Sequence, residues 1–102
     1  MKAVINSTPL ISLAIIDKLS LLSDLYDKVY VPGAVFKEVS RKGKRKASII
    51  EQWCKNKILN STDVIAKKAL ELSLDEGEAE VILLAEEIDA DIVIIDEDKG
   101  RK

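Results

Sequence analysis

Four short runs of apolar residues punctuate the chain, and each is typical of a β-strand. They span Lys2–Asn6, Lys28–Val31, Lys57–Leu59 and Asp91–Asp96. The first run does not alternate with polar residues, and the last holds four consecutive β-branched residues. Such runs are typical of strands covered on both faces, as in parallel sheets.

Longer segments between these runs carry the spacing and capping residues of helices. Asp63 caps one of them, and Asp75-Glu76-Gly77 starts another. Alternating strands and helices predict an α/β fold with a doubly wound parallel sheet of about four strands. Residues 1–102 are expected to form a single domain. The predicted helices span Pro9–Ile16, Leu19–Tyr26, Pro32–Val39, Ala47–Lys55, Asp63–Ser73 and Asp75–Ile88.

The first strand ends in Asn6, and a helix follows almost at once. Ser7 or Thr8 is expected to cap this helix, with Pro9 as its first residue. Such a strand-turn-helix unit aims a polar side chain off the carboxyl end of a strand. In open α/β sheets ligands bind at that edge, so the chain indicates a site near Asn6.

Composition narrows the chemistry of such a site. The chain has one cysteine, Cys54, and no histidine, which argues against a cysteine protease and excludes a Ser-His-Asp triad. A bound metal would need oxygen ligands, as Mg²⁺, Mn²⁺ and Ca²⁺ do. The net charge of −2 leaves any nucleic-acid binding to a local patch. With no targeting or membrane-spanning segment visible, we expect a cytoplasmic protein.

Three acids are placed where they could meet Asn6. Asp96 follows the last strand, at the same sheet edge if the strands are parallel neighbours. Glu38 lies near the buried face of its helix. Glu78 and Glu80 lie on the helix Asp75–Ile88, about 200° apart around its axis. Glu78 aligns with the apolar residues Ile82 and Ala85 and is therefore expected to face inward, and Glu80 is expected to face solvent.

Carboxylates forced together in a cleft repel one another, and a divalent cation removes that penalty. Glu38, Glu78 and Asp96 would then form an oxygen-rich site able to support phosphodiester hydrolysis. The alternative is that they are surface charges, as most of the 18 acids in 102 residues must be.

Four motifs, in this order along nearly the whole chain, resemble those of PIN-domain nucleases, especially a prokaryotic branch related to the toxin-type members. Each motif alone is weakly specific, and four in register are fairly specific. They are Asn6-Ser7-Thr8-Pro9-Leu10-Ile11, Val31-Pro32-Gly33-Ala34-Val35 with Glu38-Val39, Leu74-Asp75-Glu76-Gly77-Glu78-Ala79-Glu80, and Ile94-Ile95-Asp96-Glu97-Asp98-Lys99-Gly100-Arg101.

The resemblance implies a Rossmann-like sheet and a ribonuclease dependent on Mg²⁺ or Mn²⁺. The family's acidic quartet carries over onto Asn6, Glu38, Glu78 and Asp96, and Ser7 or Thr8 could add a hydroxyl ligand. Toxin-type relatives imply a homodimer or higher oligomer and inhibition by an antitoxin protein.

Two features depart from the family's pattern. Asn6 stands where the family usually has Asp, and its amide oxygen can ligate a hard cation but brings no charge, so metal affinity should fall. The sequence also ends at Lys102, just after the fourth motif, where family domains usually continue with a helix, a strand and a final helix. The expected domain therefore lacks those C-terminal elements, which a partner subunit, a swapped element or a truncated gene would explain.

A basic stretch follows the helix that carries Glu38. It could grip an RNA backbone, or it could be a solvated loop or a surface for an acidic partner. Trp53 and Cys54 are expected to pack rather than to stack a base or act as a nucleophile. The candidate RNA-binding residues are Arg41, Lys42, Lys44, Arg45 and Lys46.

The leading hypothesis is a metal-dependent endoribonuclease acting on single-stranded RNA, and a toxin of a toxin–antitoxin pair is one form of it. The alternative is a degenerate PIN-like domain that binds RNA or protein through the same surface.

Overall fold

A computed structural model of the chain describes residues 1–95, and residues 96–102 lie outside the described part. Its strands are β1 (Lys2–Ile5), β2 (Lys28–Pro32), β3 (Ile58–Leu59) and β4 (Ile92–Ile94). Over residues 1–95 they form one parallel sheet of four strands in the order β3-β2-β1-β4. The predicted α/β fold with a parallel sheet is confirmed.

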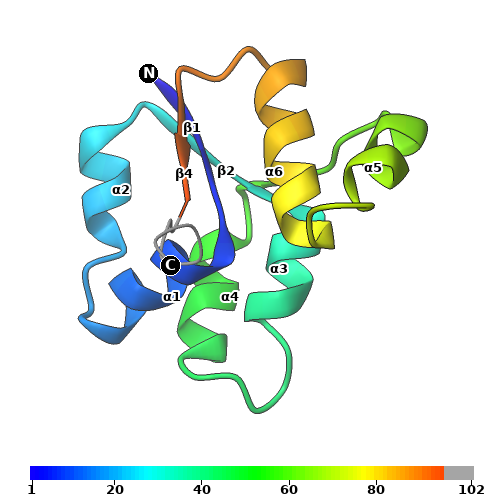
Figure 1. Cartoon of the computed structure of the whole chain (residues 1–102). Coiled ribbons are helices and arrows are strands. Elements are labelled where there is room, and N and C mark those ends of the chain that lie inside the picture. The colour runs from blue at the N-terminus through cyan, green and yellow to red at the C-terminus, as the bar shows by residue number, and fades with distance from the viewer. Residues whose placement is uncertain (96–102) are drawn as a thin grey trace, which may run out of the picture.

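Helices lie on both sides of this sheet, with α2 and α6 on opposite sides (Figure 1). Helix α6 contacts β1, β2 and β4, whereas α1, α3 and α4 contact one another around the carboxyl end of β1. Six helices are seen in residues 1–95, close to the predicted ranges: α1 (Ser7–Ile15), α2 (Ser20–Leu25), α3 (Gly33–Val39), α4 (Ala47–Cys54), α5 (Val64–Leu70) and α6 (Glu76–Glu87).

Strand β1 is the centre of the sheet and fixes the position of Asn6. Its residues Ala3, Val4 and Ile5 are fully buried and pair with β4, and Ala3 and Val4 also pair with β2 on the other side. The backbone N–H of Asn6 extends the β1–β4 ladder by donating to Ile94 O at 2.9 Å. Because β1 is hydrogen-bonded to β2 and β4, Asn6 is held at the carboxyl edge of the sheet.

Helix α1 begins earlier than the sequence predicted. Asn6 itself is the N-cap, with extended backbone angles, and its Oδ1 accepts a hydrogen bond from Ser7 N at 2.9 Å. The prediction of a cap at Ser7 or Thr8 with Pro9 first is therefore wrong. Asn is as good a cap as Ser or Thr, and Pro9 is tolerated in the first turn because N–H groups there have no intrahelical acceptor.

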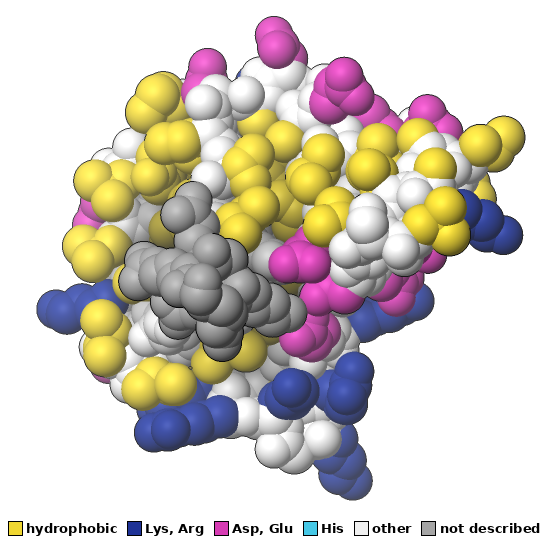
Figure 2. Space-filling view, in the orientation of Figure 1, with side chains coloured by type: hydrophobic (Ala, Val, Ile, Leu, Met, Phe, Trp, Pro, Cys, Tyr) yellow, Lys and Arg dark blue, Asp and Glu magenta, His cyan; other side chains and the backbone are white. Residues whose placement is uncertain are grey.

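Helix α5 projects from the body and contacts α6. It has no buried residue, and Ile65 is 82% exposed. Figure 2 shows hydrophobic side chains spread across the upper part of the molecule in this view and out to α5 at the right. Within residues 1–95, no helix has the length and apolar character needed to cross a membrane.

Candidate functional site

A cavity of about 370 Å³ lies between α3 and the start of α6. Helix α3 contributes Glu38, and the start of α6 contributes Asp75 and Glu76. Arg41 and Lys44, from the loop after α3, line the same cavity. Figure 2 shows acidic side chains next to the Lys and Arg side chains gathered at the lower end of the molecule. Carboxylates and cations therefore surround one hollow.

Asn6 lies next to the start of α6. The missing Cβ of Gly77 would be 3.6 Å from both Asn6 Oδ1 and Asp75 Oδ1, so both oxygens face this glycine. Asn6 is only 8% exposed and does not line the cavity. Gly77 lines the cavity, so Asn6 lies next to a residue of the cavity wall.

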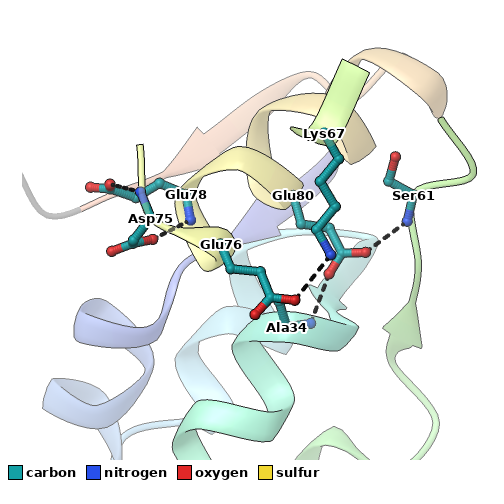
Figure 3. Close-up of polar contacts among 7 residues, drawn as sticks. All are labelled: Ala34, Ser61, Lys67, Asp75, Glu76, Glu78 and Glu80. Carbon is teal, nitrogen blue, oxygen red and sulfur yellow. Dashed lines mark hydrogen bonds and ion pairs between the residues drawn. The ribbon is translucent and has the colours of Figure 1, made fainter. Parts of the chain in front are cut away.

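Glu78 forms a reciprocal cap with Asp75 at the start of α6 (Figure 3). The Asp75 carboxylate accepts from Glu78 N at 2.7 Å, and Glu78 Oε1 accepts from Asp75 N at 3.2 Å. This capping box satisfies two backbone donors that a helix leaves unpaired, and acids in the first turn suit the helix dipole. Glu78 is half-buried and does not line the cavity.

Glu80, predicted to face solvent, is 3% exposed, so that prediction is wrong. Its Oε1 accepts from Ala34 N at 2.7 Å, and its Oε2 accepts from Ser61 N at 3.0 Å (Figure 3). Helix α6 is covered on two sides, by the sheet and by α3 and α5. The periodicity of α6 predicted one solvent-facing side and placed Glu80 on it, whereas this side of the helix is covered.

Glu87 lies about two turns further along the same face of α6 and holds the segment after β3. Its carboxylate accepts from the Ser61 hydroxyl at 2.7 Å and from the backbone N–H groups of Thr62 and Asp63. The Ser61 hydroxyl, followed by the Thr62 N–H, holds the pKa of Glu87 below its usual value. Sequence reasoning missed Glu80 and Glu87 as structural acids, although their spacing of seven places them on one helix face.

The structure describes three of the four residues expected to bind a metal ion, Asn6, Glu38 and Glu78. Within residues 1–95, no group of three or more acid, cysteine or histidine side chains is positioned to hold a metal ion. Asp96, which completes the expected quartet, lies outside the described residues. The donor chemistry fits a hard cation, because Glu38, Glu78 and Asn6 offer only carboxylate and amide oxygens.

The basic residues Arg41 to Lys46 are all exposed, as an RNA-contacting loop requires. Arg41 and Lys44 reach the acidic cavity, and Lys44 also lines a second cavity together with Lys42 and Lys46.

The PIN domain family matches residues 2–102. The chain belongs to this family. Comparisons of this PIN domain with curated proteins and with solved structures gave no match. Membership confirms the resemblance carried by the four motifs and agrees with the parallel sheet.

Cys54 and Trp53 have packing roles in this PIN domain. Cys54 is fully buried, and burial raises the pKa of its thiol to about 11, which suppresses the nucleophilic thiolate. Trp53 packs against the core, and the Lys57 ammonium lies 4.4 Å from its ring centroid. Both agree with the sequence-based expectation.

Proposed function

We propose that this PIN domain is an endoribonuclease that hydrolyses phosphodiester bonds in single-stranded RNA with Mg²⁺ or Mn²⁺. The observation that carries the proposal is the cavity that joins Glu38 and the acidic start of α6 to Arg41 and Lys44. Acids that can hold a cation and bases that can hold a phosphate are what metal-assisted phosphodiester hydrolysis needs.

Glu38, Glu78 and Asp96 would hold the metal ion, with Asn6 as a neutral fourth donor. When bound, the ion supplies positive charge against the phosphodiester and activates water for its hydrolysis. Asn6 already uses Oδ1 to cap α1, and a carbonyl oxygen has a second lone pair for another partner. Glu78 would contribute its carboxylate from the capping box, whose contacts lie at the protein surface.

Arg41 and Lys44 would bind the phosphate that enters the acidic cavity. Both are exposed, and both line the cavity that contains Glu38. The guanidinium of Arg41 can bind two phosphate oxygens at once, whereas the Lys44 ammonium acts as a point charge. These contacts would orient the scissile group and offset the repulsion between phosphate and carboxylates.

Cleavage of a labelled single-stranded RNA tests the proposal, with Mn²⁺, with Mg²⁺ and with chelator. Glu78→Gln is the informative variant, because Gln preserves the capping box while removing the negative charge. We expect metal-dependent cleavage by the unmodified chain and its loss in Glu78→Gln. Glu86→Gln, on the exposed end of the same helix, is the matched control and should cleave normally.

One observation favours a second candidate, a catalytically degenerate domain that binds RNA or protein. The first-motif residue is the neutral Asn6, and its Oδ1 is engaged as a helix cap. RNA left intact under every metal condition, with binding retained, would establish this second candidate and refute the nuclease.

A role as a toxin implies two protein partners, an antitoxin and a second copy of the chain. Helix α5 and the turn after it offer a surface for such contacts, because they carry three exposed apolar side chains, Val64, Ile65 and Leu72. Sedimentation of the purified chain compared with Ile65→Lys tests the homodimer. A dimer abolished by the substitution supports this surface, and a monomer in both samples contradicts self-association.

A further inference from the structure

A second cavity, of about 530 Å³, is lined by the loop between α3 and α4 and by the start of α4. Among residues 1–95, its lining includes the three lysines Lys42, Lys44 and Lys46, the hydroxyl-bearing Ser48, and a single acid, Glu51. The volume falls within the range of roughly 300–1,000 Å³ typical of ligand sites. Counted over the described residues, the net charge of its lining is positive, whereas the lining of the first cavity has as many acids as cations.

The two cavities meet at Lys44, which lines both of them. A chain molecule that places one phosphate beside Glu38 can therefore continue past Lys44 into the second cavity. Arg45, in the middle of the basic stretch, lines neither cavity. The loop thus separates its cations into those that face the cavities and one that does not.

Backbone turns set the directions of these lysines. Lys44 N donates to Arg41 O at 2.9 Å, and Ala47 N donates to Lys44 O at 3.2 Å, so two successive turns share Lys44. The first turn has Gly43 at its third position with a φ of +90°, as a type II turn requires. A Cβ on Gly43 would meet no atom of residues 1–95 within 4 Å, so the positive φ, and not a close contact with this part of the chain, explains the glycine.

We propose that the second cavity is an RNA subsite that binds the backbone phosphate of a nucleotide neighbouring the scissile one. The proposal rests on RNA being the substrate, as in the proposed function, and adds the path that the RNA strand follows across the protein. Lys42 and Lys46 supply charge, Ser48 supplies a hydroxyl donor, and Lys44 binds between the two phosphates. The substrate is accordingly an oligonucleotide that extends beyond the cleaved bond, and a dinucleotide lacks the phosphate that fills this subsite.

Fluorescence anisotropy of a labelled single-stranded RNA, measured with chelator present, tests the subsite apart from catalysis. Lys42→Gln and Lys46→Gln should each weaken binding roughly three- to five-fold and lower the salt slope by about 0.7. Arg45→Gln removes the same charge outside the cavities and should change affinity least. Glu51→Gln should tighten binding about two-fold, because it removes a negative charge from the cavity lining.

Gly43→Ala tests the loop's shape without changing its charge. A side chain at positive φ disfavours the turn, so binding should weaken although every cation remains. Equal losses in Arg45→Gln and Lys46→Gln, with no effect of Gly43→Ala, would show that only the number of charges matters and would overturn the subsite. Selective losses with no RNA cleavage under any metal would support the subsite and refute the nuclease.

Discussion

The Glu80 carboxylate accepts a hydrogen bond from the backbone N–H of Ala34 at 2.7 Å and so ties α6 to the start of α3. Its second oxygen accepts from Ser61 N at 3.0 Å. A buried carboxylate that bonds two backbone donors is a strong, charge-assisted junction. Because α3 carries Glu38, this junction fixes where Glu38 lies relative to the acidic start of α6.

Glu80→Gln should destabilise the protein by about 1–3 kcal/mol, because the amide keeps one acceptor and sets a donor against a buried N–H group. Urea unfolding followed by circular dichroism measures the change. Glu86→Gln, an exposed substitution of the same kind on the same helix, should stay within about 0.5 kcal/mol. Equal stabilities for the two variants would contradict the structural role of Glu80.

Much of the fold follows from local pattern. The run at Lys2 to Ile5 and the run at Ile92 to Ile94 lie as paired parallel strands, as their apolar residues predicted. The expected cover on both faces holds for β1 and is wrong for β4, whose Val93 is 39% exposed. Asp63 caps its helix as predicted, and the helix predicted to start at Asp75 has Asp75 as its cap, because capping depends on residues three positions apart. Features that depend on residues close together in the sequence could therefore be predicted from it.

The candidate site depends on longer-range packing, and there the sequence was less informative. Glu80 was assigned to solvent because periodicity identifies one apolar stripe, whereas α6 packs against the sheet and also against α3 and α5. The contacts of Glu80 with Ala34 and Ser61 join segments 46 and 19 residues away, and no local pattern records them. Asp75 and Glu76 likewise reached the cavity through the placement of α6 beside α3.

Acidification should destabilise the protein partly through Glu87. Its folded-state pKa lies below the ordinary value of 4.5, with the Ser61 hydroxyl bond as the largest cause, so its contribution is present above that value. The contribution is lost as pH falls below about 4.5 and through the folded-state pKa. Asp27, bonded to the N-terminal ammonium, acts with the same sign.

Thermal unfolding between neutral pH and pH 3 measures this dependence. Glu87→Gln should give a shallower fall in Tm below about pH 4.5 than the unmodified chain. An identical acid profile for both proteins would contradict the contribution of Glu87.

The Cys54 thiol should be inert in the folded protein. Burial raises its pKa from 9.0 to about 11, which lowers the thiolate fraction at pH 8 roughly 100-fold, and the side chain is inaccessible as well. Alkylation by iodoacetamide, followed by mass spectrometry, should proceed in denaturant and stall without it. Rapid labelling of the native protein would contradict the buried position.

Asn6→Asp should raise affinity for Mn²⁺ and increase the rate of RNA cleavage. The carboxylate can accept the same bond from Ser7 N, and it adds a negative charge that the amide lacks. Without metal the buried charge should lower stability, since Asn6 is 8% exposed, and added Mn²⁺ should restore it. Calorimetric titration and thermal unfolding measure the two effects, and unchanged Mn²⁺ affinity would remove Asn6 from the metal set.

Whether this PIN domain is a nuclease is tested by the cleavage rate of single-stranded RNA with saturating Mn²⁺, compared between the unmodified chain and Glu38→Gln. Glu38 is the predicted metal ligand that lines the cavity together with Arg41 and Lys44. We expect chelator-sensitive cleavage by the unmodified chain, a loss of at least about 100-fold in Glu38→Gln and unchanged RNA binding. Equal cleavage by the two proteins, or none by either, would refute a nuclease in which Glu38 holds the metal ion.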